Sequence, residues 1–116
     1  MPEPKIKVSA PEENQNLLAA LTYLLFFITG IIFLLIEKKN DYIRFHALQS
    51  VAVFAPLMIL LIFLSTFLGS LGLFLNFLIS VVTFAIWVYL MYRAFNGDRY
   101  HVPYIGAWVE KQLKNI

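Results

Sequence analysis

The residues best suited to chemistry form one short segment, Arg-Phe-His-Ala-Leu-Gln-Ser at positions 44–50. On a helix His46, Gln49 and Ser50 stand at i, i+3 and i+4, so their polar side chains share one face. We call Arg44, Phe45, His46, Gln49 and Ser50 the polar cluster. Either these groups hydrogen-bond their helix to its neighbours, or they form a hydrated vestibule or a lipid-headgroup site with Lys38, Lys39 and Arg44. We favour the structural interpretation.

Catalytic and metal-binding patterns are weak in this sequence. His46 and His101 are the only histidines, there is no cysteine, and no helical HxxxH or HExxH spacing occurs. No serine lies in a nucleophile elbow and no glycine-rich loop could hold a phosphate. A net charge of +2 does not indicate a nucleic-acid-binding face. We therefore expect no catalytic residue, no metal ligand, no cofactor and no nucleic-acid partner.

Four further residues stand out inside apolar stretches. Pro56 removes one backbone donor, so we expect a helix kink there. Asn76, Ser80 and Thr83 follow at spacings of four and three, which places them on one helical face. Such a stripe predicts hydrogen bonds between helices, although the same polar groups could line a transport path. No charged residue lies in the middle of an apolar run, which argues against ion-coupled transport.

The distribution of charge predicts the helices that carry these residues. The chain has 116 residues, 60% of them hydrophobic, and residues 17–36 and 45–92 carry no Asp, Glu, Lys or Arg. An uncharged apolar run of about 18 residues suffices to cross a hydrocarbon core roughly 30 Å thick. The second run is too long for one span, and Gly69–Gly72 is its natural break. Asn40 or Asp41 can cap the start of the second helix.

The sequence thus predicts an all-α integral membrane bundle of three transmembrane helices with a short C-terminal interfacial helix. The expected spans are residues 17–36, 45–68 and 73–93, within a transmembrane domain of residues 16–95. Residues 1–15 should form a flexible N-terminal tail. Residues 96–116 should form a cytoplasmic segment whose amphipathic helix lies in the membrane interface, anchored by Trp108.

The orientation follows from the basic residues. Two lysines, Lys5 and Lys7, precede the first span. Seven basic residues lie on the opposite side in a three-span arrangement: Lys38, Lys39, Arg44, Arg93, Arg99, Lys111 and Lys114. The positive-inside bias then predicts a multi-pass cell-membrane protein with its N-terminus outside and its C-terminus in the cytoplasm. The first apolar run should remain as an anchor, because no small-residue cleavage pattern follows Ile36.

The Phe-His-Ala-x-Gln-Ser signature at residues 45–50 and the stretch Val102-Pro103-Tyr104-Ile105-Gly106 also carry a family resemblance. Over roughly residues 16–113 the chain resembles the small bacterial and archaeal membrane proteins of the uncharacterised DUF forty-eight-seventy group. These are relatives of the Tic-twenty component of chloroplast protein import. The resemblance implies a helical membrane bundle, mostly of unknown function.

Three functions are compatible with these observations. The first is a non-enzymatic membrane protein that acts through helix association in the lipid bilayer, as a homo-oligomer or as an accessory subunit with other membrane proteins. The second is a channel or protein-translocation component lined by the polar stripes. The third is a lipid-headgroup-binding or enzymatic site at the cytoplasmic face. We expect the first, because three spans enclose little interior.

Overall fold

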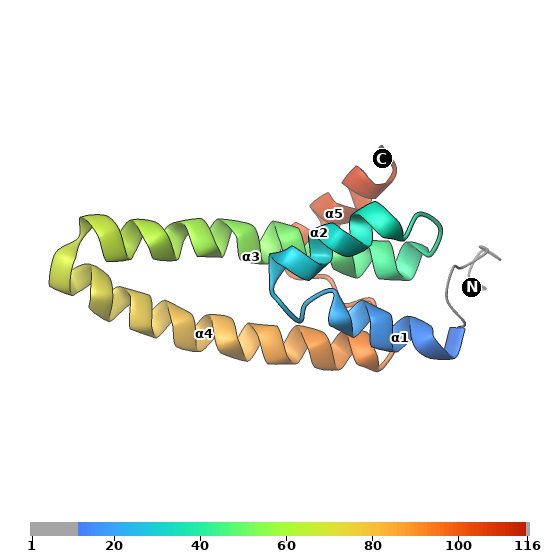
Figure 1. Cartoon of the computed structure of the whole chain (residues 1–116), viewed down its shortest axis with the longest axis horizontal. Coiled ribbons are helices and arrows are strands. Elements are labelled where there is room, and N and C mark those ends of the chain that lie inside the picture. Colours follow the sequence, from blue (N-terminus) through green and yellow to red (C-terminus); the bar gives the residue numbers. More distant parts are fainter. Residues whose placement is uncertain (1–11, 116) are drawn as a thin grey trace.

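The computed structural model describes residues 12–115, which form five α-helices and extend over 52 × 26 × 24 Å. These helices are α1 (Glu12–Leu21), α2 (Phe27–Ile36), α3 (Asp41–Phe67), α4 (Gly69–Phe95) and α5 (Ile105–Leu113). α3 and α4 form a long antiparallel hairpin, and α1, α2 and α5 gather around one end of it (Figure 1). The all-α prediction is confirmed for this part of the chain.

α3 and α4 account for the long apolar run. Each has 27 residues, or about 40 Å at the helical rise, and both are long and apolar enough to cross a membrane. α3 begins where the side chain of Asn40 accepts a hydrogen bond from the backbone N–H of Ile43 at 3.1 Å, so Asn40 is the cap. α3 continues through Pro56, which lies on an exposed face, and the kink expected there stays a prediction.

The two long helices meet in a tight turn. α3 ends at Phe67 and α4 begins at Gly69, whose φ of +58° suits glycine. The break therefore falls in the predicted glycine region, but α4 starts before the expected residue 73. Gly72 already lies inside the helix, and a Cβ there would be 1.9 Å from the carbonyl oxygen of Leu64. Only glycine lets the helices approach so closely at this point.

The expected continuous span over residues 17–36 is interrupted. α1 ends at Leu21, residues 22–26 form a turn, and α2 runs back toward the end from which α1 came (Figure 1). Each of the two helices has only ten residues, about half of what a span requires. The predicted three-span arrangement is therefore not confirmed. In the described chain two helices, α3 and α4, have the length and composition of a span.

The turn satisfies its backbone through hydrogen bonds from side chains. The Thr29 hydroxyl accepts from the N–H of Leu25 at 3.2 Å and donates to the carbonyl of Thr22 at 3.0 Å. The indole N–H of Trp87, on α4, donates to the carbonyl of Tyr23 at 2.6 Å. Non-helical backbone is tolerated at membrane depth only where protein groups satisfy it. These bonds explain how residues 22–26, which include neither Gly nor Pro, can make the turn.

The beginning of α1 lies beside the loop before α3 and the end of α4. Asn40 donates its side-chain N–H to Gln15 at 2.8 Å, and a Cβ on Gly97 would be 3.1 Å from the Asn16 amide. Placement of the two chain ends on opposite sides of the membrane is thus not confirmed. α1 begins inside the predicted tail of residues 1–15, and residues 1–11 of that tail lie outside the described residues.

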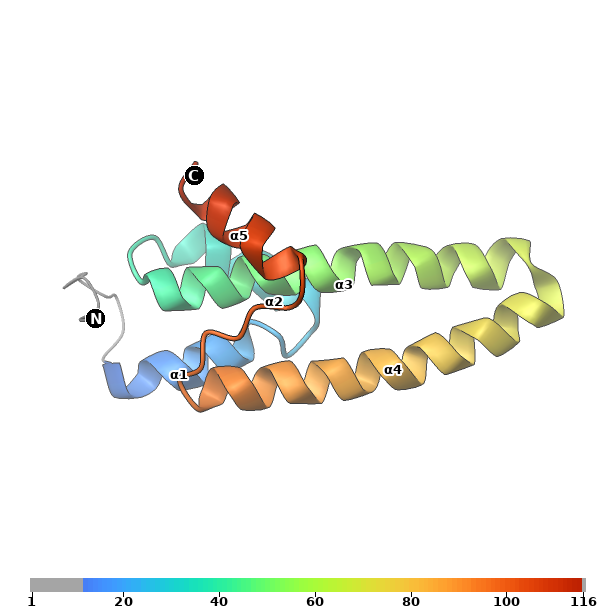
Figure 2. The ribbon, with the colours of Figure 1, turned by 180° about the vertical axis from the view of Figure 1, so that it is seen from behind.

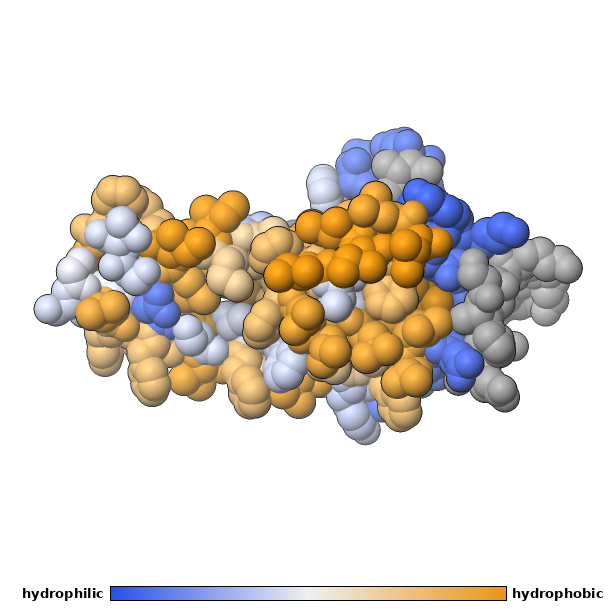
Figure 3. All heavy atoms as spheres, viewed as in Figure 1, coloured by the Kyte–Doolittle hydropathy of each residue, from blue (hydrophilic) through white to orange (hydrophobic). Residues whose placement is uncertain are grey.

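Polar surface gathers at the end where α1, α2 and α5 meet, while the visible face of the rest is largely apolar (Figure 3). α5 is the short C-terminal helix that the sequence predicts. It contacts α3 and buries Gly106 and Val109, whereas Trp108 is half-exposed. Its position in a membrane interface stays a prediction.

Candidate functional site

The polar cluster lies in the first half of α3 and is largely buried. Phe45, His46, Gln49 and Ser50 have no exposed surface. Between α4 and α5 the chain of residues 96–104 passes across α3 (Figure 2). We call residues 98–102 of this connection the strap. The cluster therefore faces the strap on one side and the turn at Tyr23 on the other.

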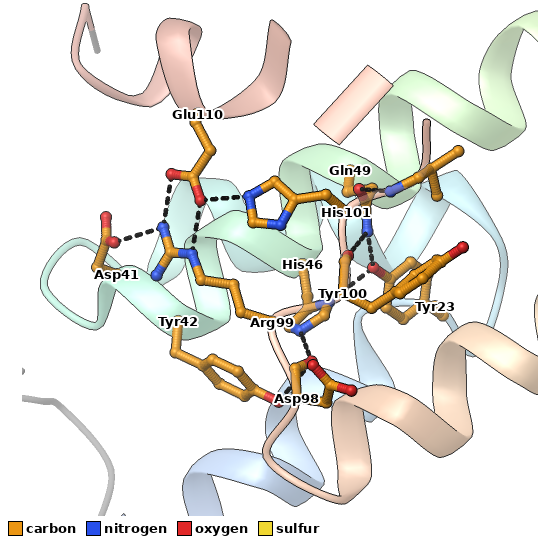
Figure 4. A network of polar contacts seen from close by, with 11 residues as sticks. Tyr23, Asp41, Tyr42, His46, Gln49, Asp98, Arg99, Tyr100, His101 and Glu110 are labelled. Atoms are coloured by element: carbon orange, nitrogen blue, oxygen red, sulfur yellow. Dashed lines mark hydrogen bonds and ion pairs between the residues drawn. The ribbon is translucent and has the colours of Figure 1, made fainter. Parts of the chain in front are cut away.

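His46 connects Tyr23 to the strap. Its Nδ1 lies 2.7 Å from the Tyr23 hydroxyl, and its Nε2 lies 3.1 Å from the carbonyl oxygen of Asp98 (Figure 4). A carbonyl can only accept, so Nε2 carries the proton and donates to Asp98. The Tyr23 hydroxyl then donates to Nδ1. Both ring nitrogens of one neutral tautomer are therefore engaged within the fold.

Gln49 holds the strap in the way that a neighbouring β-strand would. Its side-chain N–H group donates to the carbonyl of Tyr100 at 2.9 Å, and its carbonyl accepts from the N–H of Val102 at 3.0 Å. The same amide nitrogen donates to the Tyr23 hydroxyl at 2.9 Å. One buried amide thus satisfies two backbone groups of a segment that forms no helix of its own.

Ser50 and Arg44 contact α2 rather than the strap. The Ser50 hydroxyl donates to the carbonyl of Ala47 at 2.8 Å, and a Cβ on Gly30 would lie 1.9 Å from the Ser50 oxygen. α2 therefore crosses α3 at a contact that admits no side chain. The Arg44 guanidinium donates to the carbonyls of Leu34 and Glu37 at 3.1 and 2.7 Å, which satisfies the last turn of α2.

Outside the polar cluster a group of charged residues joins α5 to the strap and α3. Arg99 forms two hydrogen bonds of 2.8 Å to the Glu110 carboxylate and an ion pair of 2.7 Å with Asp41 (Figure 4). Glu110 also lies 2.7 Å from Nε2 of His101. The Arg99 guanidinium lies 4.7 Å from the centre of the Phe45 ring, a cation–π contact. We call Arg99, Asp41, His101 and Glu110 the charged latch.

The latch changes the acidity of its members. Burial alone would raise the pKa of Glu110, but hydrogen bonds from Arg99 and His101 together hold that pKa below its usual value. Burial would likewise lower the pKa of Arg99, and the carboxylates of Glu110 and Asp41 raise it instead. Both groups are therefore held in their charged forms, which suits an ion-paired contact between elements.

The stripe on α4 faces α3. Asn76 donates to the carbonyl of Leu61 at 2.8 Å, and the Ser80 hydroxyl donates to the Asn76 side-chain oxygen at 3.2 Å. Thr83 is buried, and its hydroxyl has no hydrogen-bond partner among the described residues. The structure therefore places the three residues on the face that sequence spacing predicts, but only the first two have partners there.

Several residues of this site were not predicted from sequence. Among them Tyr23, Asp98, Tyr100 and Val102 contact His46 or Gln49 from 23 to 53 positions away. Tyr23 gave one available signal, because it is a polar aromatic residue deep in an apolar run. The strap contributes mainly backbone groups, which leave no trace in side-chain type. In the described part of the chain no group of three or more His, Cys, Asp or Glu residues could hold a metal ion.

Two apolar helices of spanning length, together with the sequence comparisons, define a helical membrane protein. The profile of the magnetosome magnetite crystal formation protein family matches residues 14–109, and the chain belongs to that family. The chain is also similar to archaeal UPF0132 membrane proteins. One from Methanocaldococcus jannaschii is 37% identical over 111 residues, which cover 96% of this chain and 79% of the relative.

A second UPF0132 membrane protein, from Archaeoglobus fulgidus, is 37% identical over 103 residues, or 89% of this chain and 99% of that protein. No solved structure matches the chain. The resemblance to the DUF forty-eight-seventy group and to the Tic-twenty import component is wrong, because the matching family and relatives are others. The signature of residues 45–50 was too short to distinguish between families of small membrane proteins.

Proposed function

We propose that this chain is a non-enzymatic membrane protein that acts through helix association, with its own copies or with another membrane protein. It crosses the membrane as the α3–α4 hairpin, and α1 and α2 enter and leave from one side as a re-entrant pair. The basic residues Lys38, Lys39 and Arg99 all belong to the end where the helices gather, so we propose that this end faces the cytoplasm.

The observation that carries this proposal is how the polar cluster is used. His46 has both ring nitrogens engaged, and Gln49 uses its donors and its acceptor on Tyr23 and the strap. A catalytic or headgroup-binding arrangement needs side chains that can turn toward a ligand. Here the same groups stabilise the strap, which supports a structural role for the cluster.

We place the surface for association on α4. Large apolar side chains recur at spacings of four, four, three, four and four along one side of α4, next to the face that packs on α3, and all of them are exposed: Leu73, Phe77, Val81, Phe84, Val88 and Tyr92. This spacing is close to the repeat at which two helices keep contact along their lengths. Lipid can cover the same face, so the test must distinguish a protein neighbour from lipid.

The family's name refers to magnetite crystal formation, but we do not propose that activity for this chain. We propose that it shares the membrane architecture of the family and contributes as a scaffold in the bilayer. Direct binding of iron is not part of the proposal, because the polar side chains of the site serve the fold itself.

Crosslinking of single cysteines tests the association. The chain has no cysteine, so Phe77→Cys introduces one thiol on this exposed side of α4, and Ile59→Cys introduces a matched thiol at an exposed position of α3. In native membranes we expect a discrete crosslinked product for Phe77→Cys that persists at low expression, with little product for Ile59→Cys. A protein that remains monomeric and without a partner at both positions contradicts the proposal.

A further inference from the structure

A cavity of about 250 Å³ lies between α3 and α4, beyond the turn that joins α1 to α2. Its lining comes from α3, α4 and Phe26 of that turn, and it includes three phenylalanine rings. Phe26 has a φ of +59°, and its ring packs between Phe54 and Trp87 at centroid distances of 5.4 and 5.5 Å. The rings of Phe26 and Phe54 therefore pack together in one wall of the cavity.

One polar atom in this apolar cavity has no partner. Thr83 lines the cavity with only 8% of its surface exposed, and its hydroxyl makes no hydrogen bond to any described residue. Leaving a buried hydroxyl unpaired is costly, more so at membrane depth. Ser80 also lines the cavity, but its hydroxyl already donates to Asn76. The cavity thus offers one free donor among aromatic and aliphatic walls.

The cavity opens sideways through exposed residues of both spans. Met58 on α3 and Phe84 on α4 are 37% and 61% exposed and also line the cavity. Both lie near the middle of helices long enough to cross the bilayer, so a ligand must enter from the hydrocarbon. The volume is a little below the range of drug-sized pockets, which suits one substituted ring rather than a whole lipid.

We propose that this cavity binds the ring of a lipid-soluble quinone, with a ring carbonyl accepting a hydrogen bond from Thr83. The phenylalanine rings supply the flat apolar contacts that such a ring prefers. The isoprenoid tail leaves between Met58 and Phe84 into the lipid. A saturated acyl chain would fill the space but would leave the Thr83 hydroxyl unpaired.

Trp87 provides the reporter, because its ring lies 5.6 Å from that of Phe84. Trp108→Phe removes the other tryptophan, and the purified protein is placed in phosphatidylcholine vesicles that contain increasing amounts of a decyl-tailed benzoquinone. We expect saturable quenching of Trp87 fluorescence. Thr83→Val should raise the quinone concentration at half-saturation by about two- to ten-fold, which corresponds to the loss of one hydrogen bond. Thr83→Ser keeps the hydroxyl and should leave that concentration unchanged.

A variant whose cavity is filled by a larger side chain distinguishes binding from simple partition of the quinone into the bilayer. Leu61→Phe adds volume inside the cavity and should abolish saturation, while Leu60→Phe, at an exposed neighbouring position, should not. Helical content measured by circular dichroism confirms that each variant is folded. Quenching that rises in proportion to quinone and is equal in all variants overturns the proposal. Reaction of a charged thiol reagent with Thr83→Cys also overturns it, since the cavity would then be hydrated.

Discussion

At the scale of single residues, Gln49 matters most because one side chain satisfies two backbone groups of the strap. Gln49→Leu keeps the volume but leaves the Tyr100 carbonyl and the Val102 N–H without their partner. We expect a loss of about 1–3 kcal/mol of stability, measured by thermal or denaturant unfolding in detergent. The control is Lys111→Leu, at an exposed position of α5.

His46 offers an independent check of the same structural role. His46→Phe retains an aromatic ring and removes both hydrogen bonds, to Tyr23 and to Asp98. We expect destabilisation similar to that of Gln49→Leu and faster hydrogen exchange in residues 98–102. If His46→Phe leaves both stability and exchange unchanged, the cluster does not hold the strap and its structural interpretation is wrong.

The charged latch makes the docking of α5 dependent on pH. The pKa of Glu110 is lower in the folded protein than its usual value of about 4.3. The ion pair with Arg99 is therefore fully present above that usual value and is lost as the pH falls through the lowered pKa. We expect hydrogen exchange in α5 to increase at acid pH. In Glu110→Gln the exchange should already be raised at neutral pH and should change less with acidification.

Three neighbouring groups must be separated from Glu110 in that measurement. Arg99 remains charged throughout, whereas Asp41 and His101 are the other two members of the latch. Asp41→Asn and His101→Gln therefore accompany Glu110→Gln, and Lys111→Gln is the matched control on the exposed side of α5. An acid response that survives in Glu110→Gln and disappears in Asp41→Asn assigns the effect to Asp41 and contradicts the prediction.

At the scale of elements, the Thr29 hydroxyl bridges two backbone groups of the turn between α1 and α2. Thr29→Val is nearly isosteric and removes the bonds to the Leu25 N–H and the Thr22 carbonyl. We expect a loss of about 1–2 kcal/mol, because two hydrogen bonds are lost and each contributes about 0.6 kcal/mol on average within a membrane. Thr29→Ser keeps the hydroxyl and should be close to the original protein in the same unfolding assay. Equal stability of both variants would show that the turn does not need this bridge.

The two long helices were predictable because the absence of charge over a given length is a property of the sequence itself. Their separation at Gly69 and the cap at Asn40 followed from local residue types. The turn after Leu21 was not predictable in this way. It contains neither Gly nor Pro, and part of what stabilises it is the indole of Trp87, 64 positions from Tyr23. Hydropathy therefore indicates one continuous helix where tertiary contacts support two.

The polar cluster shows the same division between local and distant information. The spacing of His46, Gln49 and Ser50 predicted a shared face, and His46 and Gln49 both bond to Tyr23, whereas Ser50 lies against Gly30 of α2. Their partners could not be predicted, because Gln49 bonds to backbone groups at Tyr100 and Val102. Any residue type offers those groups, so no pattern marks them. For Arg44 the sequence was misleading. Its position next to Phe45 and His46 suggested a shared site, but its partners are the carbonyls of Leu34 and Glu37 at the end of α2.

At the scale of the whole molecule, the number of membrane crossings decides on which side each end of the chain lies. A third span would place the beginning of α1 opposite the end of α4. The bond between Gln15 and Asn40 and the approach of Gly97 to Asn16 place them together instead. An even number of crossings follows if α3 and α4 are the only spans. Accessibility of single cysteines from each side of the membrane distinguishes these arrangements.

Four cysteine variants suffice, because the chain has no thiol of its own. In intact cells we expect a membrane-impermeant maleimide to label Ser70→Cys, in the first turn of α4 beside its junction with α3. It should not reach Asn14→Cys, Lys39→Cys or Asn115→Cys until the membrane is opened. Labelling of Asn14→Cys together with protection of Lys39→Cys and Asn115→Cys would restore the three-span arrangement. Because the hydrogen bond between Gln15 and Asn40 joins the two regions, the Asn14 and Lys39 variants must agree if α1 and α2 form a re-entrant pair.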